Sequence, residues 1–365
     1  MAHIAGLTYV TNNQVFCLDE GGGGHVFEAS AGINATTAAV SVGQLIDPDF
    51  RVYVGTSDGK VALFAGGRLT NPPQLFQVTN QLVYLSLYHA AGVIYVGTGN
   101  LLSLGPGSVI ALDDLTFAPR WEVAAGGLVS LPVGVAYEGS VPKQVIFTNG
   151  NPNPSVTALD VITGAEVWSV PEPASGQKVH EGVVYYGNWG GDNTLRARSA
   201  SDGTLLWKFT NPSNFNFNTP VVAGGVVWAS SAGNQLFALQ AGDGSVLWEA
   251  TVNGHPGIPV LFFEHDYYNV SLVAVAEQAE NFPGYLRAFD ANTGAELWTS
   301  SMPVAQAGEL CTDPILIPAE NGHQIQIGIF EGALMTFNAF NGQLTWQKNL
   351  TPGSQLVAKP HWVNW

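Results

Sequence analysis

ALDVITGAEVW, residues 158–168, is one copy of a motif that returns along the whole chain. Three further copies share its form A-x-x-x-x-x-G-x-x-x-W: ARSASDGTLLW (197–207), ALQAGDGSVLW (238–248) and AFDANTGAELW (288–298). FNAFNGQLTW (337–346) keeps the glycine four residues before tryptophan, whereas ALDDLTFAPRW (111–121) keeps both ends and loses the glycine. Weaker copies end at Phe27 and Phe76, so the eight anchors are 49, 45, 47, 39, 41, 50 and 48 residues apart. A period of this length indicates a solenoid or a propeller.

The repeat unit itself favours the propeller. In TPVVAGGVVWASSAGNQLFALQAGDGSVLW (219–248), runs of β-branched and aromatic residues are separated by Gly-Gly, Ala-Gly-Asn and Gly-Asp-Gly. Such runs and breaks are typical of short strands and hairpins. Together with the segment that runs into the tryptophan, each unit has four strands, which is a propeller blade. We therefore predict an all-β fold, an eight-bladed β-propeller of four-stranded antiparallel blades in one domain over residues 1–365, with seven blades as the alternative.

The two ends of the chain match different parts of one unit. HIAGLTYVTNNQVFCLDE (3–20) corresponds to the second and third strands of a blade, and LVAKPHWVNW (356–365) corresponds to the first strand. The N- and C-terminal strands are therefore predicted to share a blade and to close the ring, which removes an exposed sheet edge.

The repeated tryptophans are predicted to be structural. One aromatic residue at the same position of successive units is what packing between neighbouring blades requires, since a large aromatic side chain buries about 150–250 Å². These anchors are Trp121, Trp168, Trp207, Trp248, Trp298 and Trp346. Outside the motif, Trp228 is predicted to lie in the core and Trp189 at an exposed hairpin tip.

Three apparent functional motifs are better explained as turns. GTSDG (55–59) resembles a nucleophile elbow but occupies a hairpin position of the repeat. DANTG (290–294) resembles the start of a calcium loop, yet the twelfth position of that loop is Ser301 rather than an acid. GGGG (21–24) lacks the lysine and the helix of a phosphate-binding loop.

The low content of charged residues and the negative net charge limit the kinds of partner that this chain is expected to bind. Only 11% of residues are charged, and 28 acids against 12 scattered bases give a net charge of −16. Nucleic acid and anionic membrane surfaces are therefore poor partners. The sequence contains no apolar run of about 18 residues, so we predict no membrane-spanning helix. No signal peptide is evident at Met1. Cys17 and Cys311 are predicted to be two buried free thiols, with pairing as the alternative.

A candidate ligand site follows from the aligned repeats. Residues just before each innermost strand differ between units and are polar, and strands in one ring would bring them together around the axis. Convergent polar groups in a concave site form the default binding hypothesis; ordinary solvated loops are the alternative. His180 with Glu181, or His255 with Asp313, could form an acid–base pair or bind a divalent metal. The candidates are His180, Glu181, Asn216, Asn218, Thr219, His255, Glu309, Asp313, Lys359 and His361, with Thr36-Thr37 and Tyr88-His89 at the equivalent places of the weaker copies.

The motif A-L-D-x-x-T-G-x-x-x-W, preceded by strands such as VYVGTSDGKVAL (52–63), resembles the repeat of the pyrroloquinoline-quinone-like (PQQ-like) β-propellers. This family includes quinone-dependent dehydrogenases as well as cofactor-free scaffold propellers such as those of outer-membrane assembly, so the resemblance implies the fold more firmly than the function. It also favours a periplasmic or extracellular location, in line with the low lysine content; the cytoplasm is the alternative.

The resemblance sets requirements that a quinone enzyme would meet. Such dehydrogenases have adjacent cysteines, an arginine that contacts the quinone, and calcium held by Glu, Asn and Asp. This chain has no Cys-Cys pair, and its arginines fall in hairpins and repeat turns. Only Glu181, Asn218 and Asp313 are available as calcium ligands at the candidate site.

We therefore expect no cofactor and a propeller that binds a protein, a small molecule or a glycan at its polar mouth. One alternative is an oxidoreductase, with PQQ and calcium or with His180, Glu181, Asp313 and Lys359. Another is carbohydrate recognition through aromatics such as Trp189 and Tyr88.

Overall fold

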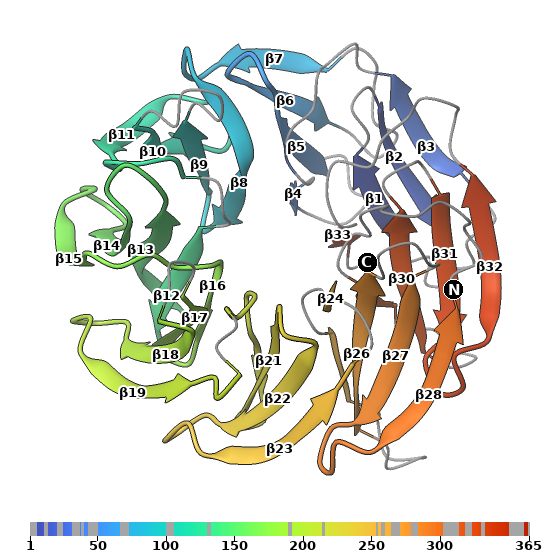
Figure 1. Ribbon diagram of the computed structural model, residues 1–365. Helices are drawn as coiled ribbons and strands as arrows, with labels where there is room; N and C mark the ends of the chain where they lie inside the picture. The colour runs from blue at the N-terminus through green and yellow to red at the C-terminus, as the bar shows by residue number, and fades with distance from the viewer. Residues whose placement is uncertain are drawn as a thin grey trace. The chain divides into compact units, whose positions relative to one another are not determined.

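The computed structural model describes residues 6–10, 14–19, 25–30, 37, 40–42, 50–65, 73–99, 106–129, 133–188, 192–213, 216–252, 255–256, 260–263, 271–278, 284–301, 314–317, 323–329, 333–349 and 361–363. The described residues form 33 strands, arranged in eight antiparallel sheets, and contain no helix. Figure 1 shows the strands by label. The all-β prediction of four-stranded antiparallel sheets is confirmed.

The chain divides into two compact units. Unit 1 comprises residues 1–182, 200–203 and 354–365, and unit 2 comprises residues 183–199 and 204–353. The division falls within the residues of one sheet, β16-β17-β18-β19. Each unit is described separately below.

Unit 1 contains three sheets built from consecutive strands and one that joins both ends of the chain. Its sheets are β3-β2-β1-β33, β4-β5-β6-β7, β11-β10-β9-β8 and β12-β13-β14-β15. The strands are β1 (Gly6–Val10), β2 (Gln14–Asp19), β3 (His25–Ser30), β4 (Val40–Val42), β5 (Arg51–Gly55), β6 (Lys60–Ala65), β7 (Gln74–Gln77), β8 (Leu82–Ala90), β9 (Val93–Gly99), β10 (Ser108–Asp113), β11 (Pro119–Ala124), β12 (Gly134–Glu138), β13 (Val141–Asn149), β14 (Ser155–Asp160), β15 (Glu166–Val170), β16 (Gln177–His180) and β33 (His361–Val363).

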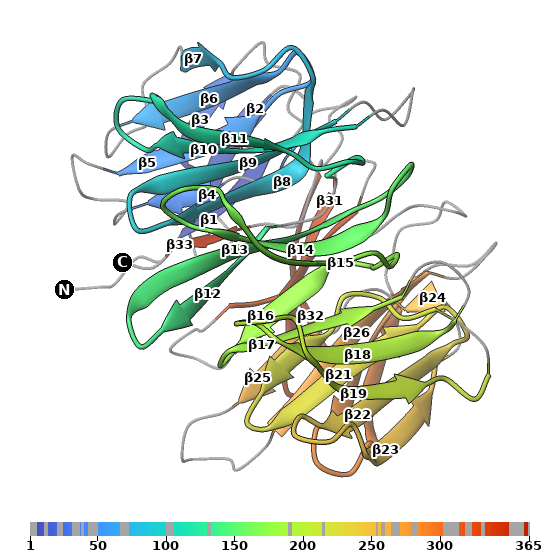
Figure 2. The ribbon, with the colours of Figure 1, turned by 90° about the vertical axis from the view of Figure 1, so that its left-hand side faces the viewer.

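Unit 2 repeats the same pattern of consecutive antiparallel strands. It contains β17 to β19 and the sheets β20-β21-β22-β23, β24-β26-β27-β28 with β25 also paired to β26, and β29-β30-β31-β32 (Figures 1 and 2). The strands are β17 (Val183–Gly187), β18 (Thr194–Ser199), β19 (Leu205–Thr210), β20 (Val221–Ala223), β21 (Val226–Ser231), β22 (Gln235–Gln240), β23 (Val246–Thr251), β24 (His255–Pro256), β25 (Val260–Phe263), β26 (Ser271–Gln278), β27 (Tyr285–Asp290), β28 (Glu296–Ser301), β29 (Ile315–Ile317), β30 (Gln324–Ile329), β31 (Ala333–Asn338) and β32 (Leu344–Asn349).

The last strand of the chain pairs with the first. In unit 1, β33 runs antiparallel to β1, with Leu7 opposite Trp362 and Thr8 opposite His361. The sequence match between the two ends predicts this pairing. It leaves no free β-edge on that side of β1, which is the side where an N-terminal strand would otherwise be open to another chain.

The spacing of the repeat motif has a direct structural cause. In the copies that run from Ala to Trp, the first and last residues are cross-strand partners in the hairpin of the third and fourth strands: Ala158 lies opposite Trp168, and Ala238 opposite Trp248. Directly opposite side chains share one face of the sheet, so the alanine methyl leaves room for the indole. A one-residue register shift follows each of these alanines, which is a β-bulge.

The middle of the motif is a turn held by its own side chains. Asp160 Oδ1 accepts hydrogen bonds from the backbone N–H of Ile162 and Thr163, at 3.0 and 2.8 Å, and from Thr163 Oγ1 at 2.8 Å. Gly164 then takes a left-handed φ of 71°. Aspartate and glycine are favoured in such turns for these two reasons. The same Asp-to-Thr bonds occur at Asp290 and Thr293, so the turn interpretation of DANTG is confirmed. GTSDG is likewise a hairpin, between β5 and β6.

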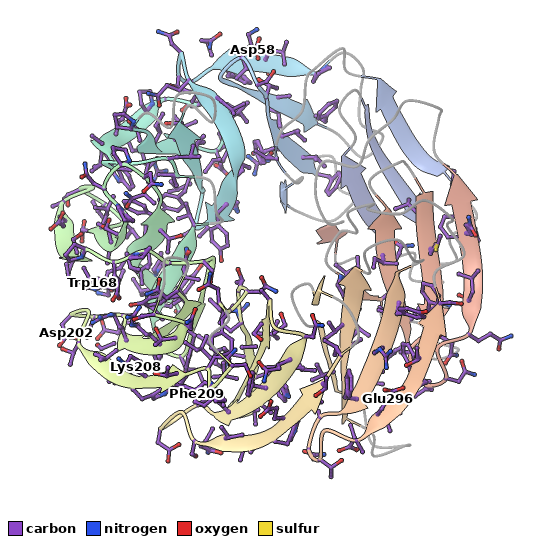
Figure 3. The ribbon with its side chains drawn as sticks, in the orientation of Figure 1. Asp58, Trp168, Asp202, Lys208, Phe209 and Glu296 are labelled. Atoms are coloured by element: carbon purple, nitrogen blue, oxygen red, sulfur yellow. The ribbon has the colours of Figure 1, made fainter. Side chains whose placement is uncertain are left out.

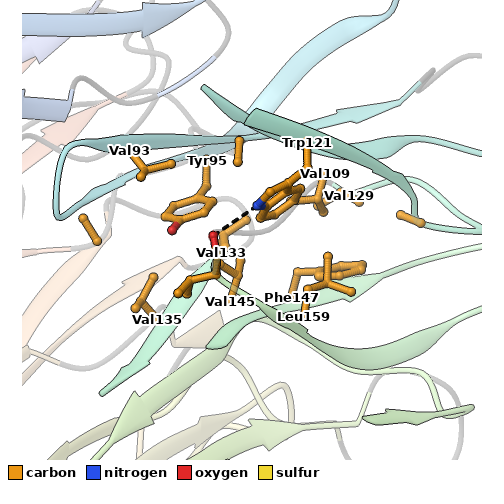
Figure 4. Close-up of a cluster of buried hydrophobic side chains, with 14 residues drawn as sticks. Val93, Tyr95, Val109, Trp121, Val129, Val133, Val135, Val145, Phe147 and Leu159 are labelled. Carbon is orange, nitrogen blue, oxygen red and sulfur yellow. Dashed lines mark hydrogen bonds between the residues drawn. The ribbon is translucent and has the colours of Figure 1, made fainter. Parts of the chain in front are cut away.

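The anchor tryptophans dock onto the motif of the following repeat. The Trp121 indole N–H donates to the Val161 carbonyl at 3.1 Å (Figure 4), and Trp168 donates to the Ala200 carbonyl at 2.7 Å. Equivalent bonds of 2.8 to 3.0 Å join Trp207 to Ala241, Trp248 to Ala291 and Trp298 to Ala339. Through these bonds each of the five tryptophans joins its own repeat to the next one. Trp346 is half-buried.

Each docked indole lies directly on the motif glycine. A Cβ atom built on Gly203 would lie 2.8 Å from the ring of Trp168, and one on Gly244 would lie 2.6 Å from the Trp207 ring. Figure 3 labels Trp168. Gly164, Gly294 and Gly342 stand in the same relation to Trp121, Trp248 and Trp298. Glycine is therefore required twice here, for its left-handed backbone and for the close approach of the ring. We call each indole, carbonyl and glycine set a latch.

The hydrophobic core lies between consecutive sheets. In unit 1, Tyr95 and Trp121 from the sheet β11-β10-β9-β8 pack with Val135, Val145 and Phe147 from the sheet β12-β13-β14-β15 (Figure 4). In unit 2, Trp228 is 2% exposed and packs with Trp248 and Phe289, which confirms its predicted core position. Burying these faces at roughly 25 cal/mol per Å² of apolar surface gives neighbouring repeats their main reason to associate.

Candidate functional site

The innermost strand of each sheet has two ends, and the described residues show different chemistry at each. We call the end where the innermost strand begins its starting end; the second strand of the sheet ends there. At the opposite end, the innermost strand turns through a hairpin into the second strand, and the turn of the repeat motif lies beside that hairpin. In the sheet β20-β21-β22-β23, the backbone N–H of Ala241, in the motif turn, donates to the carbonyl of Gly225, in the first hairpin. The predicted ligand site belongs to the starting ends.

Two pairs of predicted site residues lie at the wrong end of their strands. His180 is the last residue of β16, and Glu181 lies in the turn that follows with a left-handed φ of 46°. Tyr88 and His89 likewise come near the end of β8, not its start. The prediction that these residues precede an innermost strand is wrong. The segments HEGVVYY and LYHAAGVIY resemble strand starts because polar residues precede a β-branched run in both contexts.

His180 and Glu181 do meet, but in solvent. Their Nε2 and Oε1 atoms are 3.8 Å apart, and the Glu181 side chain is 86% exposed. An exposed pair at this separation contributes little, and nothing in its surroundings favours an acid–base role. Tyr88 is half-buried against the core of unit 1, and burial raises its pKa. It is therefore not the freely exposed platform that glycan stacking would use.

The residues that do occupy the starts of innermost strands in unit 1 are hydrogen-bonded to their own sheet or, for Gln177, to the preceding sheet. Thr37 Oγ1 accepts from the backbone N–H of Gly55 at 2.8 Å. Gln81 accepts from Thr98 Oγ1 at 2.9 Å and donates to the Pro106 carbonyl at 3.0 Å. Gln177, the first residue of β16, donates to the Ile146 carbonyl at 2.9 Å. Gln81 and Gln177 were missed from the sequence because the misaligned hairpins took their place.

In unit 2 the starting ends carry a denser polar cluster. Asn218, which precedes β20, donates through Nδ2 to Ser230 Oγ at 3.0 Å. Gln235 donates to Ser213 Oγ at 3.0 Å and to Glu249 Oε1 at 2.7 Å. Next to β17, Asn188 donates to Asp192 Oδ1 at 2.7 Å. We call Asn188, Asp192, Ser213, Asn216, Asn218, Gln235 and Glu249 the polar end of unit 2.

Two amide oxygens of the polar end are buried without a hydrogen-bond partner in the described part of the chain: Asn188 Oδ1 and Asn216 Oδ1. Asn188 is 4% exposed, and Asn216 is half-buried beside the fully buried Phe217. A buried acceptor without a donor costs about 1–3 kcal/mol. Both oxygens lie beneath the surface, whereas amide, hydroxyl and carboxylate groups of the polar end form hydrogen bonds with one another and with Ser230.

The remaining candidates are placed only in part. His255 begins β24 and His361 begins β33, as predicted for strand starts, and nothing is described of their side chains. Thr219 is half-buried two residues before β20. Glu309, Asp313, Lys359, Trp189 and the GGGG segment lie outside the described residues, as does Cys311, so its pairing with Cys17 is not tested.

The described residues do not fit the calcium set of a quinone enzyme. Glu181 is exposed in a hairpin turn, and the Asn218 amide is fixed by Ser230. Over the described ranges, no three His, Cys, Asp or Glu side chains gather as a metal site would need, and no helix there is long and apolar enough to span a membrane.

Comparison with known proteins identifies the family of this chain. The sequence profile of the family described as PQQ_2, outer membrane protein assembly factor BamB, matches residues 152–355. The chain belongs to this family of PQQ-like repeat propellers.

Individual similarities agree with the family. Over 269 residues the chain is 26% identical to outer membrane protein assembly factor BamB of Nitrosomonas eutropha, covering 70% of this chain and 61% of that protein. The chain thus spans less than two thirds of that relative. The crystal structure of BamB from Moraxella catarrhalis aligns with a TM-score of 0.62 at 18% identity, over 87% of this chain and 92% of that one.

Enzymes share the fold as well. A europium-containing methanol dehydrogenase aligns with a TM-score of 0.63 at 12% identity, over 87% of this chain and 79% of that one. Identities this low establish the propeller fold alone.

Proposed function

We propose that this chain is a cofactor-free, partner-binding β-propeller that serves as an assembly scaffold in the cell envelope, as the name of its family describes for BamB. In this proposal residues 1–365 form one ring of eight blades, closed by the pairing of β33 with β1. The family match supports the proposal, since the description of the family names an outer membrane assembly factor. The low charge and the scattered bases point to a protein partner rather than nucleic acid.

The binding surface we propose is the mouth formed by the starts of the innermost strands. The polar end of unit 2 supports this, because amide, hydroxyl and carboxylate groups gather there at the starts of the strands. Backbone N–H groups of a protein segment, or side-chain hydroxyl groups, have the required chemistry. Asn218, His255, Asp313, Lys359 and His361 would add to the same mouth, whereas His180 and Glu181, at the hairpin end, no longer belong to it.

Site-specific photo-crosslinking tests this proposal. A photoreactive residue replaces Thr219, beside the polar end, in the full-length protein expressed in its own envelope. The matched control replaces Gly242, in the motif turn at the opposite end of the same sheet, where an added side chain would meet nothing within 4 Å. We expect a discrete envelope protein to be captured from position 219 and not from position 242. Equal capture from both positions, or from neither, would contradict binding at the mouth.

The oxidoreductase is the second candidate, favoured by the methanol dehydrogenase fold similarity. It requires bound quinone, and it predicts dye reduction with an alcohol or a sugar after reconstitution with PQQ and calcium. The scaffold proposal predicts no such turnover.

A further inference from the structure

One junction in unit 1 lacks the tryptophan–glycine latch. It lies between the sheets β4-β5-β6-β7 and β11-β10-β9-β8. In the motif copy 111–121, the position of the glycine is taken by Phe117, and the position of the accepting carbonyl is Asp114. The anchor facing this copy is Phe76, in β7, instead of tryptophan. Both halves of the latch have therefore changed together.

The two phenylalanines stack face to face. The Phe76 and Phe117 ring centroids are 3.7 Å apart and the ring planes differ by 4°. Phe117 is 8% exposed and keeps the left-handed backbone of the glycine it replaces, with φ of 57°. At the regular latches, even a single added Cβ would come within 2.5 to 2.8 Å of the indole. A phenylalanine in the turn is thus compatible with a phenylalanine anchor, and a tryptophan anchor needs glycine.

The carbonyl of this latch is satisfied by different donors. A phenyl ring has no N–H, and the Asp114 carbonyl instead accepts from Tyr53 Oη at 2.9 Å and from Arg51 Nη1 at 3.2 Å. Both donors come from β5, in the same sheet as Phe76. Tyr53 is fully buried, so this bond replaces the indole bond without leaving a buried carbonyl unpaired.

The Asp114 side chain adds an ionic contact that the regular latches lack. Its carboxylate lies 3.3 Å from Arg51 and 2.9 Å from His89 Nε2, with 8% of the side chain exposed. At the regular latches this position is Val161, Ala200, Ala241, Ala291 or Ala339, which have no side-chain charge. The turn 113–117 therefore presents a ring and a carboxylate, and the sheet β4-β5-β6-β7 presents a matching ring, a hydroxyl and a guanidinium.

We propose that this junction is a selective docking site between two repeats: the sheet β4-β5-β6-β7 accepts the turn 113–117 and rejects the glycine turns of the other repeats. The five regular latches use interchangeable parts, so they do not distinguish one neighbour from another. Among the junctions that the described residues form, this one has chemistry incompatible with the others and so pairs these two repeats selectively, because selectivity requires a penalty against the wrong partner as well as a gain with the right one. This assigns Phe76, Phe117, Tyr53 and Arg51 a role in the selective pairing of these two repeats, independent of any ligand.

A double-mutant cycle on the full chain tests this. The variants are Phe76→Trp, Phe117→Gly and the double variant, and the readouts are the urea midpoint and the hydrogen exchange of the β10 and β11 amides. We expect each single change to lower the midpoint and speed exchange, because a tryptophan meets a phenylalanine in one case and a phenylalanine faces a gap in the other. The double variant should recover most of the loss, since it recreates a regular latch. A double variant that loses the sum of the two single losses would overturn the proposal.

A milder pair keeps the test decisive if a variant fails to fold. Phe76→Leu and Phe117→Leu retain apolar groups but remove the stacked rings, and coupling between them is again expected. The matched control transfers the phenylalanine pair to a regular latch as Trp168→Phe with Gly203→Phe. We expect this pair to remain less stable than the original latch, because the Ala200 carbonyl loses its indole donor. Full recovery there would show that the Tyr53 and Arg51 donors do not contribute to selectivity.

Discussion

Replacing Gly244 by alanine isolates the contribution of a latch. Gly244 has a left-handed φ of 72°, and a Cβ added there would lie 2.6 Å from Cε3 and 2.8 Å from Cδ2 of Trp207. A contact below 3.0 Å forces the indole to move. Trp207 is 7% exposed and its N–H donates to the Ala241 carbonyl at 2.8 Å, so the ring has little freedom to move without breaking that bond.

The expected cost has two parts. An L-residue in the left-handed region costs roughly 1–2 kcal/mol. Forcing extra volume into a packed contact costs about 1–3 kcal/mol more. Gly244→Ala should therefore lower the free energy of unfolding by about 2–5 kcal/mol in total.

Gly225→Ala provides the matched control, because only the first part applies to it. Gly225 lies in the first hairpin of the same sheet with φ of 76°, and an added Cβ would meet nothing within 4 Å. Urea unfolding followed by tryptophan fluorescence and circular dichroism measures both variants. We expect Gly244→Ala to be less stable than Gly225→Ala by about 1–3 kcal/mol. Equal losses would refute the claim that the motif glycine is required by the docked indole.

Three further predictions concern hydrogen bonds and charge. Trp168→Phe removes the indole donor of the Ala200 carbonyl, so the free energy of unfolding should fall by at least about 1–3 kcal/mol; an unchanged urea midpoint would contradict the latch. Hydrogen bonds from the backbone and side chain of Thr163 lower the pKa of Asp160, so its contribution is complete above the ordinary aspartate pKa of about 4 and is lost as the pH falls below that value; Asp160→Asn should lose less stability than the parent protein between pH 5 and pH 3, and parallel losses would show that Asp160 contributes nothing to acid sensitivity. Burial raises the pKa of Tyr53 to about 12, so its contribution is present below about pH 10 and is lost as the pH rises toward 12; Tyr53→Phe should be less stable at pH 7 and less sensitive to alkali, and an identical alkaline profile would count against this.

The sequence was most informative where local chemistry repeats. The spacing from Ala158 to Trp168 is that of two cross-strand partners joined by a fixed turn, so any chain that forms this hairpin needs the same residues at the same interval. The turn needs aspartate and glycine for local reasons, and the indole needs the glycine. These requirements are contained in eleven residues, which is why the four-stranded sheets and the anchors were predictable.

The candidate site was less predictable because it depends on which end of a strand a residue occupies. HEGVVYY and TPVVAG both place a polar residue before a β-branched run, yet Glu181 lies in a hairpin after β16, whereas Thr219 precedes β20. An alternating pattern of apolar residues does not show whether the polar residue before it begins a strand or lies in a hairpin. Gly182, which has a left-handed φ, is the feature that marks HEGVVYY as a hairpin.

The Phe76–Phe117 junction shows what a departure from a repeat can mean. From the sequence, the missing glycine of ALDDLTFAPRW and the missing tryptophan before it read as two separate losses. In the structure the two changes compensate each other, because the two phenylalanine rings stack and Tyr53 and Arg51 donate the hydrogen bonds that the indole would otherwise donate. Arg51 and Phe117 are 66 positions apart in the sequence. A pattern of neighbouring residues therefore does not reveal that they belong to the same contact.

A thermal shift experiment with pyrroloquinoline quinone and calcium, together and separately, tests the central claim of a cofactor-free scaffold most directly. A ligand present at 100 times its dissociation constant stabilises a protein by about 2.7 kcal/mol, which raises the unfolding midpoint of a large domain by several degrees. The scaffold predicts the same midpoint under all conditions. A rise that requires quinone and calcium together would contradict it and establish a quinone site.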